Sequence, residues 1–374
     1  MKVILLQKNF KQGVFATSYI TGKNNNLPIL NNLLIQAKAG VIKLISTDLE
    51  MGITSTVRGK IEEDGSLTVN AKVLANYINL LPNKKIDIAQ DGQNLSLECD
   101  NYKTKINGDL ADDYPLIPEV SCDQVYKVNI NDFKEAVASV LFAVSADDSR
   151  PAFTGVLLTI EGRVVTMVGT DSYRLAERKL ELAEGASDEL KRVILPLKTL
   201  QELNRIISGD YSDEHENNLL KIVLNENQVL FTFDNIEIVS RLIDEKYPDY
   251  KQIIPTGCKT EMILDREEFA RAVKTSAIFS KSGVNDVILD FKADAGQMVI
   301  SSASGQTGQN EAGLNGKLEG SDNSVTINYR YLLDGLSNIK SSSVKWQMID
   351  CNTPCLLKPA DNDNYVYIIM PIKR

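Results

Sequence analysis

The residues of this sequence best suited to chemistry are lysines and arginines that recur in two repeated phrases. Each phrase places a basic residue three times along the chain, at Lys11, Lys134 and Arg271 in the first and at Lys72, Lys198 and Arg330 in the second. Further cations, Lys8, Lys274, Arg205 and Arg266, stand within the same stretches. Basic side chains repeated along helices can bind phosphates, so the pattern indicates a surface for a polyanion.

Composition alone favours a second interpretation. Acidic residues stand among these cations, at Glu135, Glu202, Glu267 and Asp334, so ordinary solvated helix faces also explain the pattern. The net charge of −9 disfavours a conventional high-affinity DNA-binding protein, because such affinity depends on how many phosphates are neutralised. A protein that encircles DNA escapes this objection, since topology rather than affinity retains it.

Residues that could support catalysis or bind a metal are sparse. The single histidine, His215, lies in a polar stretch typical of a solvated loop, and Cys351 and Cys355 lack the partner pair that a zinc site needs. A solvated turn also explains Asp147-Asp148-Ser149, and no phosphate-binding glycine loop is present. We therefore expect a non-catalytic protein without metal or cofactor. An enzyme and an exported adhesive repeat protein are the alternatives.

The elements that position the basic residues form a long repeat. Phe10 and Val14 open the first helical phrase, which returns at Phe133 and again at Phe269. The second phrase occupies residues 71–80, 196–206 and 328–336. A period of about 125 residues is far longer than a solenoid repeat, so each copy is a domain with its own core. We expect three domains, at residues 1–124, 125–254 and 255–374.

Between the helical phrases the chain alternates apolar and polar residues in short runs separated by Gly, Asn and Asp. The clearest predicted strands are 85–88, 95–97, 156–160, 221–224, 229–233, 287–291 and 365–369. The expected fold is α+β, with antiparallel sheet and two helices on one face in each domain.

Helix ends and domain connectors also have recognisable signals. Asp265 followed by Glu268 resembles a capping box, Asn131 is the predicted cap of the helix that holds Phe133, and Pro196 suits a first helical turn. Tyr-Pro phrases at 113–118 and 246–255 predict extended connectors, because proline ends strand pairing.

The absence of a signal-like N-terminal run predicts a cytoplasmic protein, and an odd number of cysteines, five, suits a reducing compartment. No stretch approaches the roughly 20 apolar residues of a membrane span.

Five phrases together carry a resemblance that extends from end to end. They are Leu27-Pro28-Ile29-Leu30-Asn31-Asn32-Leu33-Leu34, Thr47-Asp48-Leu49-Glu50-Met51, Thr170-Asp171-Ser172-Tyr173-Arg174-Leu175, Tyr247-Pro248-Asp249-Tyr250 and Ile368-Ile369-Met370-Pro371-Ile372-Lys373-Arg374. In this order and spacing they resemble the bacterial β sliding clamps, the β subunits of DNA polymerase III. The resemblance implies a DNA-binding processivity factor for DNA replication, a ring-forming homodimer of the DNA clamp fold that encircles double-stranded DNA without reading its sequence.

The resemblance also implies three sets of site residues. DNA-facing residues would be Lys11, Lys23, Lys72, Lys134, Arg150, Lys198, Arg205, Arg271, Lys274 and Arg330. A pocket for the short motifs of partner proteins would comprise Phe153, Thr170, Ser172, Tyr173, Arg174, Leu175, Pro248, Ile253, Pro354, Ile368 and Met370. Dimer contacts would include Ile106, Ile278 and Phe279. The implied partners are the replicative polymerase α subunit, the clamp loader, and other motif-bearing repair and replication proteins.

Overall fold

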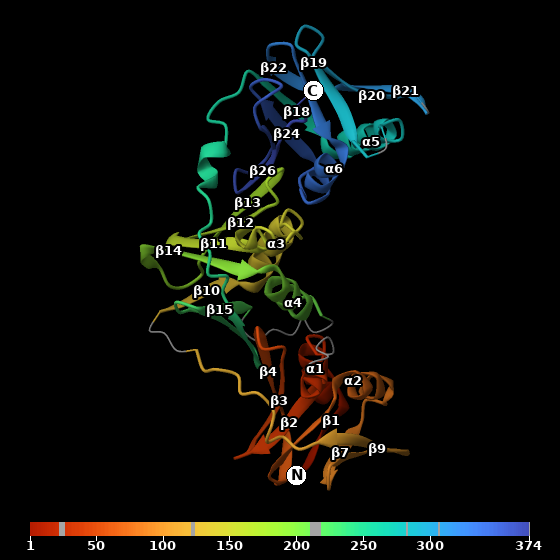
Figure 1. Cartoon of the computed structure of the whole chain (residues 1–374), viewed down its shortest axis with the longest axis vertical. Helices are drawn as coiled ribbons and strands as arrows, with labels where there is room; N and C mark the ends of the chain where they lie inside the picture. The colour runs from red at the N-terminus through yellow and green to blue at the C-terminus, as the bar shows by residue number, and fades with distance from the viewer. Residues whose placement is uncertain (22–26, 121–123, 210–217, 282, 306, 374) are drawn as a thin grey trace. The chain divides into compact units, whose positions relative to one another are not determined.

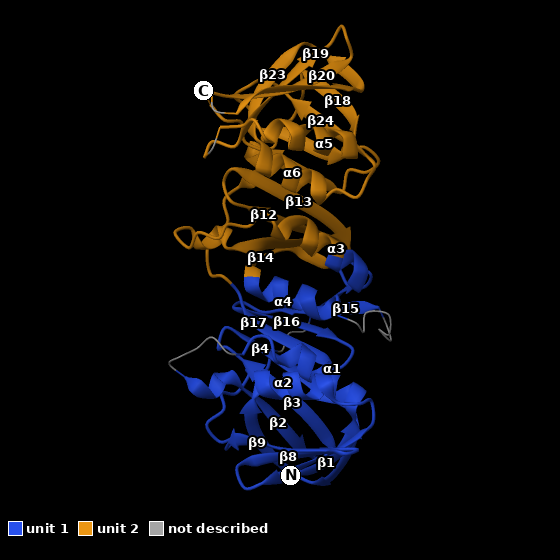
Figure 2. Ribbon diagram, turned by 90° about the vertical axis from the view of Figure 1, so that its right-hand side faces the viewer, with its two compact units in different colours: residues 1–134, 182–186, 198–242 blue, residues 135–181, 187–197, 243–374 orange. Residues whose placement is uncertain are grey.

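The computed structural model describes residues 1–21, 27–120, 124–209, 218–281, 283–305 and 307–373. The chain divides into two compact units, coloured separately in Figure 2. Unit 1 comprises residues 1–134, 182–186 and 198–242, and unit 2 comprises residues 135–181, 187–197 and 243–374. Each unit combines one outer repeat with part of the middle repeat, because strands of the middle repeat pair with strands on either side of it in sequence.

Unit 1 is organised on a sheet of 13 described strands, all antiparallel to their neighbours. Their order is β10 (Val125–Asn129), β15 (Leu219–Leu224), β16 (Gln228–Phe233), β17 (Ile236–Arg241), β4 (Met51–Val57), β3 (Val41–Thr47), β2 (Asn32–Lys38), β6 (Gly65–Asn70), β9 (Tyr102–Asp109), β8 (Asn94–Cys99), β7 (Lys85–Asp91), β1 (Lys2–Leu6) and β5 (Gly59–Glu63).

Unit 2 contains two sheets among its described residues. The larger runs β14 (Ser187–Pro196), β11 (Gly155–Gly162), β12 (Val164–Thr170), β13 (Arg174–Glu181), β26 (Tyr365–Ile369), β25 (Cys355–Pro359), β24 (Ser343–Met348), β18 (Thr260–Asp265) and β22 (Lys317–Gly320). The smaller runs β21 (Gly308–Asn315), β20 (Gln297–Ser304), β19 (Asp286–Lys292) and β23 (Asn323–Asn328). All seven strands expected from alternation are present, and the α+β prediction is confirmed.

Six α-helices lie in the described residues, two for each sequence repeat (Figure 1). The first phrase forms α1 (Gln7–Thr17), α3 (Ile130–Leu141) and α5 (Arg266–Ala277). The second forms α2 (Ala71–Leu80), α4 (Leu197–Ile207) and α6 (Tyr329–Ser337). Short 3-10 helices occur at Pro28–Asn31, Pro151–Phe153 and Tyr250–Ile253. None of these described helices is long and apolar enough to cross a membrane.

Helix caps were predicted with mixed success. The Asp265 side chain accepts a hydrogen bond from the Glu268 backbone N–H at 2.9 Å, as predicted. The prediction that Asn131 caps α3 was wrong. The helix already begins at Ile130, and the Asn129 carboxamide oxygen accepts a hydrogen bond from the Asn131 N–H at 2.9 Å. The prediction that Pro196 lies in a first helical turn was also wrong, because Pro196 is the last residue of β14 and α4 begins at the following residue.

The packing of α1 on its sheet depends on one small residue. A Cβ added at Gly13 would lie 2.7 Å from a methyl of Val57 and 2.8 Å from one of Leu44, closer than such atoms approach. Glycine in a helix interior costs about 1 kcal/mol relative to alanine. Here it brings α1 close to β3 and β4, and Phe10 and Val14 join the buried core of unit 1.

The two Tyr-Pro connectors are anchored alike. The Tyr114 hydroxyl donates to the Asn32 carbonyl at 3.1 Å and lies 3.4 Å from the Ile45 carbonyl, while the Tyr247 hydroxyl donates to the Val168 carbonyl at 3.4 Å. Burial raises the pKa of Tyr114 to about 12, so the phenol remains a neutral donor at physiological pH. Each predicted connector is therefore fixed to the sheet of the repeat that precedes it.

Candidate DNA-facing helices and peptide pocket

Two matching turns show that the sequence repeat is also a structural one. The Thr47 hydroxyl donates to the Met51 carbonyl at 2.9 Å, and Asp48 Oδ1 accepts from the Met51 N–H at 2.8 Å. In the corresponding turn, Thr170 donates to the Arg174 carbonyl at 2.6 Å, and Asp171 Oδ1 accepts from the Arg174 N–H at 3.0 Å. A left-handed residue sits at the centre of each, Leu49 (φ 77°) and Ser172 (φ 79°).

Two strand pairings join successive repeats in the same way. In unit 1, β4 pairs antiparallel with β17, and Ser55 lies opposite Ile236. In unit 2, β13 pairs antiparallel with β26, and Arg178 lies opposite Tyr365. We call these pairings, with the helices packed beside them, seam 1 and seam 2. Each seam extends a sheet across a repeat boundary by backbone hydrogen bonds.

Most of the predicted DNA-facing side chains are accessible on their helices. Lys72 on α2, Arg271 and Lys274 on α5, and Arg330 on α6 are exposed, while Lys11 on α1 and Lys134 on α3 are half-buried. Lys198 on α4 is exposed but forms an ion pair with Asp48 of the first turn. Its charge is thus partly offset within unit 1, whereas the basic side chains named on α2, α5 and α6 are exposed to solvent.

Arg205 has structural contacts that the sequence alone did not suggest. Its guanidinium carbon lies 4.4 Å from the Phe15 ring centre and 4.7 Å from that of Tyr19. The same group pairs with Glu202 at 2.6 Å and donates to the Phe15 carbonyl at 3.0 Å. Arg205 therefore fastens α4 to α1 in seam 1 through stacking and charge-assisted hydrogen bonds.

Of the two loop residues predicted to contact DNA, Arg150 lies in the described part of the chain. Arg150 is exposed and donates through Nη1 to the Ser172 hydroxyl at 2.9 Å. It therefore adjoins the turn of the predicted peptide pocket. Lys23 lies outside the described residues, as does His215.

An apolar cluster in unit 2 brings several predicted pocket residues together. Leu175 and Ile368 face each other across the β13–β26 ladder and are buried with Tyr247 and Leu356. Phe153 packs on this cluster, with its ring centre 5.8 Å from that of Tyr247 in an edge-to-face arrangement. Because Leu175 is 1% and Ile368 0% exposed, these two side chains form a floor beneath the surface.

Other predicted pocket residues lie at the surface near this floor. The Met370 N–H donates to the Tyr173 carbonyl at 2.9 Å, which continues the β13–β26 pairing by one step and places Met370 beside the turn. Tyr173 is 63% exposed, Ile253 is 41% exposed, and Pro248 is exposed on the connector, while Pro354 precedes β25. Accessible apolar side chains over a buried apolar floor suit a short peptide with aliphatic anchors.

Arg174 connects this turn with α6. Its Nε pairs with Asp171 at 2.9 Å, its Nη1 pairs with Asp334 of α6, and its guanidinium carbon lies 4.7 Å from the Tyr331 ring centre. Thr170 is buried at 6% exposure and closes the turn below it. These residues have strong structural partners, which fix the shape of the candidate pocket.

The predicted dimer residues lie near strand edges. Ile106 is on β9 and 8% exposed, Ile278 follows α5 and is 69% exposed, and the Phe279 ring lies 3.9 Å from the position of a Cβ added at Gly308 of β21.

Sequence reasoning missed Leu80, an apolar side chain at the end of α2 that is 82% exposed. Its counterpart in the second phrase, Ile206, is buried in seam 1, and alignment of the phrases could have identified it.

Comparison with known proteins decides the family. The DNA polymerase III β subunit descriptions match in order, the N-terminal domain at residues 1–118, the central domain at 127–249 and the C-terminal domain at 251–373. The β sliding clamp of Staphylococcus epidermidis is 32% identical over 359 residues, which cover 93% of this chain and 92% of that protein. The chain belongs to the β sliding clamp family.

Solved clamp structures agree over the whole chain. A DNA polymerase sliding clamp from Bacillus subtilis has a TM-score of 0.92 at 27% identity and covers 100% of this chain and 99% of that one. A Pseudomonas aeruginosa clamp bound to griselimycin has a TM-score of 0.93 at 26% identity with 100% coverage of both. The chain therefore has the three-domain clamp fold and is a DNA polymerase III sliding clamp, a non-catalytic processivity subunit that acts with DNA and polymerase.

Proposed function

We propose that two copies of this chain close head to tail into a ring that surrounds duplex DNA. The observation that supports this most strongly is that the same seam occurs twice within the chain, at β4–β17 and β13–β26, while the two strands for a third, one at a sheet edge and one paired on one side over most of its length, remain available. By the repeat order, the strand corresponding to β4 and β13 is β21, and the strand corresponding to β17 and β26 is β9. A β21 to β9 pairing between two copies repeats the seam, and head-to-tail contacts that close produce rings.

The edges of both strands fit this proposal. In the described part of the chain β21 pairs only with β20, and β9 pairs with β6 only through Gly108 and Asp109, which leaves residues 102–107 with one partner strand. An unpaired strand edge is a template for pairing with another chain. The exposed Leu80 lies where seam 1 has the buried Ile206, and pairing of the edges covers it.

We also propose that helices α1 to α6 line the hole and meet phosphates without reading bases, largely through water. The DNA-facing residues are those named above.

The unit 2 pocket binds linear motifs of the polymerase α subunit, the clamp loader and other repair and replication proteins. The supporting feature is its accessible rim over a buried floor. The proposed domains are 1–124, 125–254 and 255–374, and the proposed location is the cytoplasm.

Charge reversal on the helices tests the DNA-facing assignment. Lys72→Glu, Arg271→Glu and Arg330→Glu together change exposed side chains on α2, α5 and α6. We expect a shorter residence on nicked circular DNA and a salt dependence of binding weaker by up to about 3 in log–log slope, since each phosphate contact contributes roughly one. Dwell time measured by single-molecule fluorescence over a range of salt concentrations gives both values.

The matched control makes the same charge change on strands. Lys38, Lys221 and Lys292 are exposed on β2, β15 and β19, and their joint replacement by Glu alters net charge equally. We expect this control to retain most of the wild-type dwell time. Equal dwell times for wild type and the helix variant, or equal losses in both variants, would show that these helices do not face the duplex. Affinity for the motif peptide should stay constant in all three proteins.

A further inference from the structure

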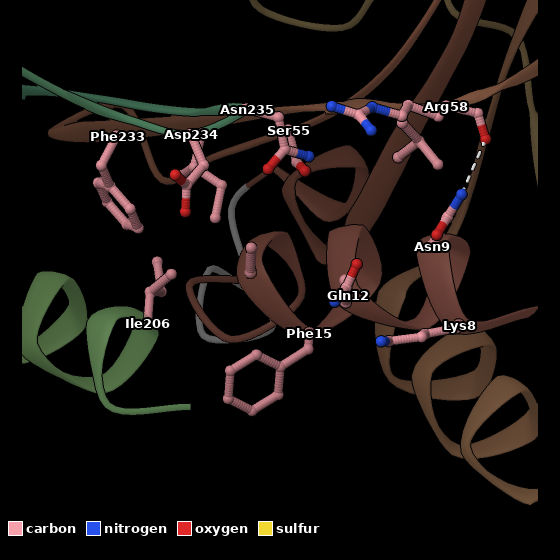
Figure 3. A pocket seen from close by; sticks show the side chains of 13 residues that line it. Lys8, Asn9, Gln12, Phe15, Ser55, Arg58, Ile206, Phe233, Asp234 and Asn235 are labelled. Atoms are coloured by element: carbon pink, nitrogen blue, oxygen red, sulfur yellow. Dashed lines mark hydrogen bonds between the residues drawn. The ribbon is translucent and has the colours of Figure 1, made fainter. Parts of the chain in front are cut away.

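Seam 1 contains a cavity of about 320 Å³ that no part of the clamp's activity uses. It lies between α1, α4, the end of β4 and the turn that joins β16 to β17 (Figure 3). Small-molecule sites in proteins typically have volumes of about 300 to 1,000 Å³. All of its lining residues belong to unit 1, so the cavity is complete within that unit.

At several corresponding positions, seam 1 carries shorter side chains than seam 2. In seam 2, Arg178 Nη2 donates to Glu135 Oε1 at 3.1 Å, and Lys340 donates to the other oxygen of Glu135 at 2.6 Å. By alignment of the repeats, Ser55 stands in the place of Arg178 and Gln12 in the place of Glu135.

Two further replacements enlarge the difference. Ile236 stands opposite Ser55, where seam 2 has Tyr365 opposite Arg178, and Ser208, just after the second phrase, corresponds to Lys340. Long ion-paired and aromatic side chains that fill the space in seam 2 are thus replaced by short or neutral ones. Seam 1 keeps its backbone pairing but leaves a hollow beneath α1.

One buried polar atom lacks a partner at this cavity. Ser55 is 1% exposed, and its hydroxyl has no hydrogen-bond partner within the described residues. The hydroxyl oxygen itself has almost no accessible surface and lies 3.3 Å from the position of a Cβ added at Gly13, so it is packed beneath α1.

The lining has a cationic end and an apolar end (Figure 3). Lys8 and Arg58 lie at one end, together with Asn9, whose carboxamide donates to the Arg58 carbonyl at 3.4 Å. Phe15, Ile206 and Phe233 lie at the other. Asp234 follows Phe233 at this apolar end, so its carboxylate disfavours an anion there and favours one near Lys8 and Arg58.

We propose that this cavity binds a small carboxylic acid with a single aromatic or branched aliphatic body. The body packs among Phe15, Ile206 and Phe233, and the carboxylate points toward Lys8 and Arg58. The opposing ends of the cavity thus select an amphipathic anion over a neutral or cationic analogue.

Titration with three probes of one shape tests the chemical class. The full chain is titrated with 3-phenylpropionate, 3-phenylpropionamide and 3-phenylpropylamine, and binding is followed by ligand-observed NMR at low ionic strength. We expect saturable binding of the acid to one site per chain, at least about tenfold tighter than binding of the amide, and weakest binding of the amine. No saturable binding of the acid, or equal binding of acid and amide, would overturn the proposal.

Two variants assign the binding to this cavity. Ser55→Arg with Gln12→Glu copies the Arg178–Glu135 pair into seam 1, fills the hollow, and should abolish binding of the acid. Lys8→Gln changes an exposed side chain and should weaken binding of the acid by several-fold while leaving the amide unchanged. Lys60→Gln, a change at an exposed lysine on β5, is the matched control and should bind as wild type does.

Folding is checked independently of the cavity. Circular dichroism and thermal unfolding of the full chain report on unit 1, which holds all of the substituted residues, while motif-peptide affinity reports on unit 2. Should the double variant fail this check, Lys8→Gln still decides the assignment. Wild-type acid binding in a folded Lys8→Gln variant would contradict the proposed orientation, and wild-type binding in the folded double variant would exclude the cavity.

Discussion

Replacing Ile278 with Asp is expected to convert the clamp from dimer to monomer at micromolar concentration. Ile278 is 69% exposed in the single chain, yet Phe142 at the same place in the middle repeat packs on Tyr367 with ring centres 5.4 Å apart. A charge at a buried apolar contact leaves an unpaired ion, so we expect a loss of about 2 to 4 kcal/mol in association. That corresponds to a roughly 30- to 1,000-fold weaker dimer.

Sedimentation velocity over a concentration series measures the dimer dissociation constant. Leu190→Asp is the matched control, because Leu190 is an apolar residue of β14 with 53% exposure and lies on neither β9 nor β21. Leu80→Asp should resemble Ile278→Asp, since both side chains lie at the proposed third seam. A stable dimer in both edge variants would place the interface elsewhere.

Replacing Met370 and Ile253 with Ala is expected to weaken binding of partner peptides by about 1 to 3 kcal/mol each, or roughly 5- to 150-fold. Both side chains lie at the accessible rim above the floor formed by Leu175 and Ile368. Truncation at the rim removes contact area without disturbing the buried cluster. Isothermal titration with a synthetic peptide carrying the clamp-binding motif of the polymerase α subunit gives the affinity.

Val164→Ala provides the control for this pocket. Val164 is 41% exposed at the start of β12, as exposed as Ile253, and is not among the proposed pocket residues. Its truncation should leave peptide affinity unchanged. The dimer should persist in all three variants, because neither edge strand is altered. Undiminished affinity in Met370→Ala and Ile253→Ala would remove the pocket assignment.

The elements were predictable where the signal is local. Alternation located β7, β16 and β26, and Asp265 marked the start of α5, because strand faces and caps depend on residues close in sequence. Asn131 was mistaken for a cap because the competing Asn129 is equally suited and only the course of β10 into α3 decides between them.

The contacts that build the seams were not predictable from local pattern. Arg205 looked like a solvated cation of α4, yet it stacks on Phe15 and Tyr19, which are nearly 200 positions away in sequence. The cavity beneath α1 likewise follows from a comparison of Ser55 with Arg178 that requires the strand register. Repetition in sequence gave the number of domains, whereas pairing between repeats fixed what lies at their boundaries.

The most direct test of the account is retention of the clamp on DNA of different topology. The clamp is assembled on nicked circular plasmid with its clamp loader and ATP, separated from unbound protein, and followed after a restriction enzyme linearises half of the sample. A closed ring with inward helices predicts that the clamp stays on circular DNA and slides off linear DNA. Equal retention on the two forms would contradict encirclement.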